Sequence, residues 1–135
     1  MTVNSSPKRV LIVDDQPDVR LAFRYMLEHY GYAVGEAANG ADALSYLSKQ
    51  RVDVILTDLY MPGMDGLSLV RVVRASPAPQ PRVIAISGSP NMGKDASLQA
   101  AQILGADAIL PKPISRERLM KTIQSLTGEQ LLPSH

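Results

Sequence analysis

The fold is decided by VDVILTD, residues 52–58, a short and almost continuously apolar run that ends in an acidic side chain. Continuous apolarity, in place of alternation, indicates a strand that is covered on both faces, as in a parallel sheet. We therefore expect a strand at Val52–Thr57. Similar runs predict further strands at Arg9–Val13, Arg82–Ile86 and Ala108–Leu110, with a weaker one at Tyr32–Glu36.

Segments with helical spacing separate these runs. The clearest is Asp18–Tyr30, with Pro17 suited to its first turn, Gly31 suited to its end, and one apolar stripe formed by Val19, Ala22, Phe23, Met26, Leu27 and Tyr30. Further helices are expected at Ala41–Leu47, Leu67–Arg74 and Ala96–Leu104, and after Ser115 as N-cap, with Leu119, Ile123 and Leu126 apolar.

Strict alternation of strands and helices predicts a doubly wound α/β domain. The commonest small solution is flavodoxin-like: a five-stranded parallel sheet in the order 2-1-3-4-5, with five helices completing three αβα layers. With 135 residues, 45% of them hydrophobic, the chain can bury one core. We expect a single domain at residues 8–126, between a disordered N-terminal tail at 1–7 and a C-terminal tail at 127–135.

Charge and composition exclude several classes of function. The net charge is +1, from 14 basic and 13 acidic residues spread along the chain, which predicts neither nucleic-acid nor membrane binding. Without cysteine there are no disulfides and no thiolate chemistry. No segment has the apolar length of a signal peptide or of a membrane span, so a soluble, cytoplasmic protein is the default expectation.

Chemically active side chains follow the predicted strands. Asp14 and Asp15 follow the first strand, Asp58 the third, Ser87 the fourth and Lys112 the fifth. The carboxyl ends of parallel strands meet at one edge of a sheet, where ligands bind in this class of fold. Three neighbouring carboxylates repel one another, so they should hold protons or bind a hard cation such as Mg²⁺.

This set suits phosphoryl transfer. Asp58 can act as nucleophile on phosphorus, Lys112 and the metal can supply countercharge, and Ser87 can donate a hydrogen bond to a phosphoryl oxygen. Each residue alone has a simpler interpretation: an Asp pair before a helix is usually an N-cap, and a serine or lysine in a turn is usually solvated. Residues suited to one reaction follow four of the predicted strands, and this coincidence favours phosphoryl transfer over the separate structural roles.

Four stretches resemble the receiver domain of bacterial response regulators, and the resemblance covers nearly all of residues 8–126. They are VLIVDDQPDVR, VDVILTDLYMPGMDGL, VIAISG and GADAILPKPI, at residues 10–20, 52–67, 83–88 and 105–114. The resemblance implies that Asp58 is the phosphoacceptor and that Ser87 and Lys112 engage the phosphoryl group. It also implies a cis bond between Lys112 and Pro113.

The same resemblance implies a metal site. Asp14 and Asp15 would form the acidic pocket, with Asp15 a direct ligand of Mg²⁺, or of Mn²⁺ in its place. Asp58 and the backbone carbonyl of Tyr60 would complete the protein's share of the metal shell.

By resemblance, the chain is a signalling switch and not an enzyme, since it catalyses only its own phosphorylation and dephosphorylation. The phosphoryl donor would be a phosphohistidine of a sensor histidine kinase or histidine phosphotransfer protein that docks beside the first helix. Because no output domain follows Leu126, we expect the signal to reach a downstream protein target directly, by further phosphotransfer, or through phosphorylation-dependent dimerisation of a monomer.

Three features depart from the family pattern. Ile109 stands three residues before the lysine, where many members carry a switching Phe or Tyr, so packing is an alternative role for it. The ring of Tyr60 could screen the phosphoryl group from water, or could lie on the loop surface. Gly88, in the long loop SGSPNMGKDAS, would leave the site open to a partner's histidine.

Two other functions remain as alternatives. A haloacid-dehalogenase-like phosphatase also uses a strand-end Asp and Mg²⁺, but it needs a second Asp two residues later, where this chain has Tyr60. A phosphorylation-independent adaptor with a receiver fold is the other alternative, and the complete acidic pocket with Lys112 argues against it.

Overall fold

The structure is a computed structural model that describes residues 7–59, 66–87 and 105–128. Its five strands are parallel and lie in the order β2-β1-β3-β4-β5, which confirms the predicted flavodoxin-like topology. The elements, in chain order, are β1 Arg9–Val13, α1 Pro17–His29, β2 Ala33–Ala37, α2 Gly40–Lys49, β3 Val54–Asp58, α3 Gly66–Arg74, β4 Arg82–Ser87, β5 Ala108–Pro111 and α5 Arg116–Thr127.

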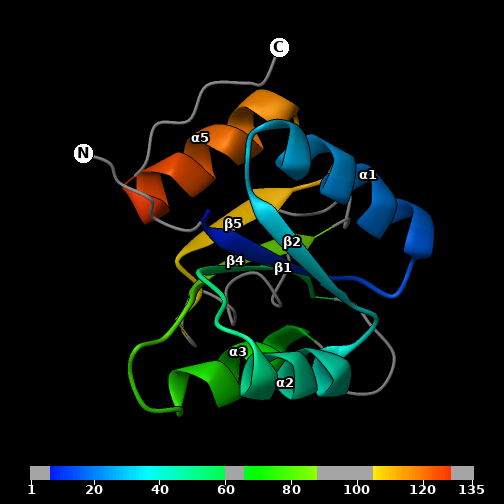
Figure 1. Ribbon diagram of the computed structural model, residues 1–135. Helices are drawn as coiled ribbons and strands as arrows, with labels where there is room; N and C mark the ends of the chain where they lie inside the picture. Colours follow the sequence, from blue (N-terminus) through cyan, green and yellow to red (C-terminus); the bar gives the residue numbers. More distant parts are fainter. Residues whose placement is uncertain (1–6, 60–65, 88–104, 129–135) are drawn as a thin grey trace.

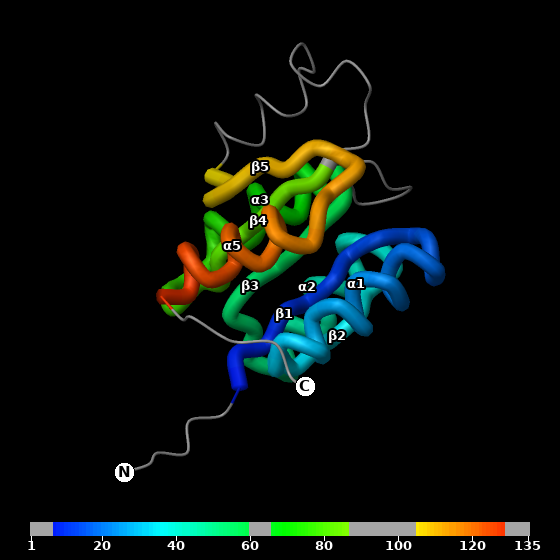
Figure 2. Tube along the Cα trace, turned by 90° about the horizontal axis from the view of Figure 1, so that it is seen from above, coloured from blue at the N-terminus to red at the C-terminus, as the bar shows by residue number. Residues whose placement is uncertain are grey.

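Helices cover both faces of the sheet. Figure 1 shows α1 and α5 on one face and α2 and α3 on the other, and Figure 2 views the sheet from the α1 and α5 side. Alternate residues of β1 enter different cores: Val10 and Ile12 pack with Leu27 of α1 and Ile123 of α5, whereas Leu11 packs on the other side. Continuous apolarity therefore did indicate strands buried on both faces.

Several predicted boundaries differ from the structure by one or two residues. β2 and β3 both begin later than predicted. β3 also extends to Asp58, which pairs with Ile86 of β4 and is thus part of the ladder. Ala22, at the margin of the predicted stripe of α1, is exposed. The predicted helix Ala96–Leu104 lies outside the described residues.

Two helix starts are capped by side chains. Asn39 accepts a hydrogen bond from the Asp42 amide at 2.8 Å, before α2. Ser115 accepts one from the Arg118 amide at 3.1 Å, which confirms the cap predicted for α5. Within the described part of the chain, no helix has the length and apolar character that a membrane span requires.

Gly66, the first residue of α3, allows the helix to start directly against the end of β3. A Cβ at this position would press on the carbonyl oxygen of Asp58 and would lie 2.8 Å from Cα of Leu59. Both are backbone atoms held by the sheet, since Leu59 donates its N–H to the Ile86 carbonyl at 3.0 Å. Only glycine therefore fits here without moving the strand end that carries Asp58.

We expect Gly66→Ala to lower the free energy of unfolding by about 1–3 kcal/mol, because overpacking against rigid backbone is costly. Helix propensity alone predicts the opposite sign, a gain of roughly 0.5–1 kcal/mol, so urea denaturation separates the two effects. Arg71→Ala, at an exposed position of the same helix, should change stability by less than about 0.5 kcal/mol. A Gly66→Ala variant that is more stable than the unaltered protein would contradict the close contact between Gly66 and the backbone of Asp58 and Leu59.

Candidate functional site

Three carboxylates meet at the carboxyl edge of the sheet. Val13 of β1 pairs with Thr57 of β3, so the next residues along the two strands, Asp14 and Asp58, lie side by side. Asp14, Asp15 and Asp58 each present an oxygen such that these three oxygens lie within 4.8 Å of one another. Asp14 is 3% exposed and Asp58 is 8% exposed, whereas Asp15 faces solvent. The predicted acidic cluster therefore exists, with two buried members and one accessible member.

Lys112 brings a positive charge to the same place. Its Nζ lies 3.6 Å from Oδ2 of Asp58 and 3.8 Å from Oδ2 of Asp14, and its side chain is 32% exposed. Pro111 of β5 pairs with Ser87 of β4, so the next residue projects past the same edge as Asp58. The Lys112–Pro113 peptide bond is cis, as the resemblance implied. Among the described residues, the carboxylates of this cluster, which we call the acidic pocket, therefore have the Lys112 ammonium beside two of them.

The environment of Asp14 disfavours its charged form. Burial is the largest influence and raises its pKa above the usual value, and the nearby carboxylates of Asp58 and Asp15 raise it further. The Gln16 amide and the Lys112 ammonium act in the opposite direction without cancelling the effect. Repulsion and desolvation at this edge are thus only partly compensated by the protein itself.

Two of the simpler interpretations, an aspartate N-cap and a freely solvated lysine, differ from what the structure shows. The N-cap of α1 is Gln16, which makes no capping side-chain hydrogen bond. Asp14 Oδ1 accepts the Gln16 amide at 2.9 Å, within the turn before the helix. Lys112 is two-thirds buried and faces two carboxylates, so it is no freely solvated loop residue.

The remaining predicted residues are placed only in part. The Ser87 backbone lies at the carboxyl edge of the sheet, one residue beyond Ile86, which pairs with Asp58. The Ser87 side chain, Tyr60, Gly88 and the long loop lie outside the described residues. Ile109 packs, partly buried, against Leu59 and Ala85, which supports the packing role for this position.

The donor set fits a hard divalent cation. Carboxylate oxygens are the ligands that Mg²⁺ prefers, and Mg²⁺ commonly uses one or two carboxylates while keeping several waters. Two of these carboxylates are buried, and the third, Asp15, is exposed and can be reached from solvent. Asp14, Asp15 and Asp58 are therefore the residues that could hold the ion.

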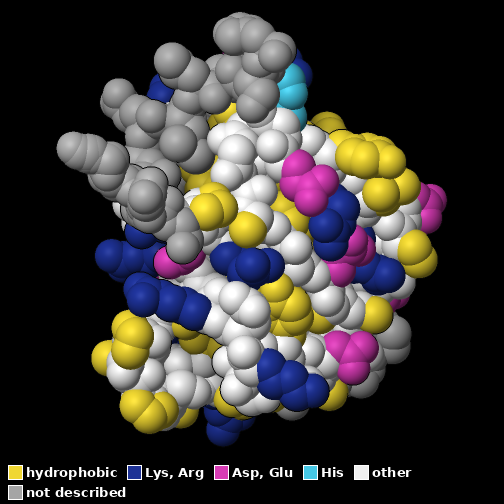
Figure 3. All heavy atoms as spheres, viewed as in Figure 1, with side chains coloured by type: hydrophobic (Ala, Val, Ile, Leu, Met, Phe, Trp, Pro, Cys, Tyr) yellow, Lys and Arg dark blue, Asp and Glu magenta, His cyan; other side chains and the backbone are white. Residues whose placement is uncertain are grey.

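An ion-pair network beside the pocket was not predicted from the sequence. Glu36 of β2 accepts hydrogen bonds from Nε of Arg20 at 3.0 Å and from Nε of Arg24 at 2.6 Å, and Arg24 also pairs with Glu28. Figure 3 shows acidic and basic side chains alternating over α1 and β2. Burial alone would raise the pKa of Glu36, but the two arginines outweigh it and hold the pKa below its usual value. The available signal was an acid within an apolar strand and two arginines one helical turn apart.

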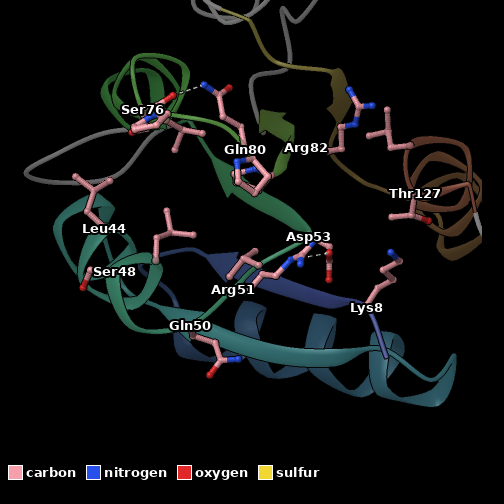
Figure 4. Close-up of a pocket in the computed structure, with 17 residues that line it drawn as sticks. Lys8, Leu44, Ser48, Gln50, Arg51, Asp53, Ser76, Gln80, Arg82 and Thr127 are labelled. Atoms are coloured by element: carbon pink, nitrogen blue, oxygen red, sulfur yellow. Dashed lines mark hydrogen bonds and ion pairs between the residues drawn. The ribbon is translucent and has the colours of Figure 1, made fainter. Parts of the chain in front are cut away.

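A pocket of about 500 Å³ lies at the opposite edge of the sheet, where the strands begin. Figure 4 shows Lys8, Arg51, Asp53 and Arg82 around it. Asp53 is already engaged there, because its Oδ2 accepts the Arg9 amide at 2.8 Å and its Oδ1 lies 4.0 Å from Nε of Arg51. The described members of the predicted site, Asp14, Asp15, Asp58 and Lys112, do not line this pocket.

Comparison with known proteins identifies the family of the chain. The family model described as the response regulator receiver domain matches residues 10–124. The chain is 34% identical to the response regulator MprA of Mycobacterium sp. (strain KMS) over 120 residues, which are 89% of this chain and 50% of that protein. It is 40% identical over 108 residues to protein-glutamate methylesterase/protein-glutamine glutaminase 3 of Hahella chejuensis, covering 77% of this chain and 30% of that one.

Solved structures agree. A signal receiver domain from Bermanella marisrubri is 34% identical with a TM-score of 0.81, covering 90% of this chain and 98% of that chain. A CheY-like receiver domain from Methylobacillus flagellatus is 32% identical with a TM-score of 0.77, covering 90% and 99%. The chain spans about half the length of MprA. On this sequence, fold and edge geometry, the chain belongs to the response regulator receiver domain family.

Proposed function

We propose that the chain is a phosphorylation switch in which Asp58 accepts a phosphoryl group from a phosphohistidine. One observation carries this proposal: a nearly buried strand-end carboxylate lies in one cluster with two further carboxylates and 3.6 Å from a lysine ammonium. Such a cluster is costly to hold together for structure alone, because burial and repulsion both oppose its charge. A function that uses the charge explains why it is there.

In the proposed step, an oxygen of Asp58 attacks phosphorus and forms a P–O bond while the P–N bond to the donor histidine breaks. The bonding electron pair leaves with the imidazole nitrogen, which then takes a proton. Lys112 is proposed to stabilise the negative charge on the transferring group, and its Nζ, 3.6 Å from Oδ2 of Asp58, supports this role. Ser87 is proposed to donate a hydrogen bond to a phosphoryl oxygen.

Asp14 and Asp15, together with Asp58, are proposed to hold Mg²⁺, or Mn²⁺ in its place, with the backbone carbonyl of Tyr60 as a further ligand. A divalent ion at this position supplies countercharge to the phosphoryl oxygens. Asp15 is the exposed member of the set and is therefore proposed as the direct ligand that solvent and ion reach first. Asp14 and its Gln16 contact position the buried side of the pocket.

The proposed donor is a sensor histidine kinase or a histidine phosphotransfer protein, and the output is a protein target. The new dianionic group would draw Ser87 and Lys112 toward it and would bias the output surface, which we expect to be formed by the predicted helix Ala96–Leu104 together with β5 and α5. Because Ile109 already packs against Leu59, we propose that backbone and helix movement carries the switch without an aromatic side chain. A phosphatase of the haloacid-dehalogenase kind is disfavoured by Tyr60 at the position of its second Asp.

Incubation with Mg²⁺ and a small phosphodonor is expected to add one phosphoryl mass to the intact protein. Asp58→Asn should abolish this addition, because its amide cannot form the acyl phosphate. Mass spectrometry of the intact chain is the measurement. Asp42→Asn, a similar change at an exposed position at the start of α2, is the matched control and should be labelled like the unaltered protein.

Equal labelling of Asp58→Asn and the unaltered protein would overturn the assignment of the acceptor. Absence of labelling in every variant, including the control, would favour the phosphorylation-independent adaptor in place of the switch.

Lys112→Met is expected to slow phosphorylation on the order of 100-fold, the size of effect seen when one preorganised donor to a developing charge is removed. The same variant should bind Mg²⁺ more tightly than the unaltered protein, because a positive charge next to two carboxylates is lost. Rates of mass uptake and a calorimetric Mg²⁺ titration measure the two effects. Lys121→Met, exposed on α5, should change neither; a phosphorylation rate unaffected by Lys112→Met would contradict the role of Lys112.

A further inference from the structure

The side chain of Arg20, in the first turn of α1, joins the acidic pocket to the neighbouring strand. Its Nη1 donates a hydrogen bond to the backbone carbonyl of Asp14 at 2.7 Å, and its Nε donates to Oε1 of Glu36 at 3.0 Å. The Arg20 side chain is only 17% exposed. It therefore contacts, at once, the residue that begins the pocket and an acid of β2.

The carbonyl of Asp14 lies just beyond the strand ladder. The last paired residue of β1 is Val13, opposite Ala37 on β2, and the Asp14 amide still donates to the Ala37 carbonyl at 3.1 Å. With Arg20 bound to the carbonyl and the Gln16 amide bound to Oδ1 at 2.9 Å, the amide, the carbonyl and the side chain of Asp14 are all held. The position of this carboxylate is thus determined from three directions.

Arg20 is itself held in place. Its guanidinium is planar and presents its donors in a rigid fork, so two acceptors from different elements fix its orientation. Glu36 is fixed in turn from the other side by Nε of Arg24, which reaches Oε2 at 2.6 Å. Arg24 and Arg20 share the same acid, but Arg20 alone of the two is bonded to Asp14 in this network.

We infer that Arg20 is a positioning residue for the acidic pocket: it holds the Asp14 turn in the geometry that cation binding and phosphoryl transfer require. This inference rests on the proposed function, because it concerns the same carboxylates. In the part of the chain that the structure describes, the Arg20 side chain donates to the Asp14 carbonyl and to Glu36, so we infer that it acts on the pocket through Asp14.

The direction in which Mg²⁺ affinity changes when Arg20 is removed distinguishes positioning from simple electrostatics. A guanidinium near a cation site repels the incoming cation, so removing its charge would tighten Mg²⁺ binding if charge were all that mattered. Loss of a group that orients a metal ligand has the opposite effect, and such supporting contacts are commonly worth 10- to 100-fold in metal affinity. Weaker binding after removal of Arg20 can therefore come only from lost geometry.

The test compares Arg20→Met with Arg24→Met in the full chain. Arg20→Met should weaken Mg²⁺ binding roughly tenfold, measured by calorimetric titration. In metal-free protein it should also accelerate hydrogen exchange at the Gln16 amide, which donates to Asp14. Arg24→Met also removes a bond to Glu36 and one positive charge, but it should leave both readouts close to those of the unaltered protein. Arg20→Lys keeps the charge without the rigid fork and should behave like Arg20→Met.

Mg²⁺ binding by Arg20→Met that equals or exceeds that of the unaltered protein would overturn the inference, as would equal losses in the two methionine variants. If the unaltered protein neither binds Mg²⁺ nor accepts a phosphoryl group, the proposed function fails. In that event the Gln16 exchange rates still decide whether Arg20 holds the Asp14 turn. Should Arg20→Met not fold, Arg20→Lys supplies the same comparison.

Discussion

Three carboxylates are held together at one edge of the sheet although they repel one another, and this repulsion is the constraint on which the site depends. Two unit charges about 4 Å apart repel by roughly 4 kcal/mol at an effective permittivity of about 20. The parallel ladder enforces the proximity, since β1 and β3 are paired up to the residues that precede Asp14 and Asp58. Lys112 and the Gln16 amide compensate only in part, which is why the pKa of Asp14 remains raised. We therefore propose that this cluster of carboxylates binds a cation, which would also balance the charge of a phosphoryl group.

The rest of the molecule supports this edge. Two apolar cores, one on each face, fix the strands and with them the backbone of Asp58. Gly66 lets α3 begin against the same strand end, and Arg20 ties the Asp14 turn to Glu36 on β2. The Gly66 and Arg20 contacts reach the backbone of Asp58 and of Asp14, so they determine where these two carboxylates stand.

Much of this could be predicted from the sequence because the signals are local. Apolar runs of strand length locate the five strands, and the rule for parallel sheets places whatever follows them at one edge. The Arg20 contact to Asp14 could not be predicted, because it depends on how α1 packs beside β2 in the folded chain. The tight approach at Gly66 likewise depends on a tertiary contact that no sequence period reveals. Packing at Ile109 is supported by its neighbours Leu59 and Ala85, which the local sequence does not identify.

The central claim, that the repelling carboxylates form a cation site, is tested most directly by urea unfolding with and without Mg²⁺ at constant ionic strength. The unaltered protein should gain stability with Mg²⁺ concentration, by about 2.7 kcal/mol at one hundred times the dissociation constant. Asp14→Asn should be more stable than the unaltered protein in chelator, because repulsion is relieved, and should gain much less from Mg²⁺. An unaltered protein whose stability is indifferent to Mg²⁺, together with an Asp14→Asn variant that is less stable in chelator, would contradict the account.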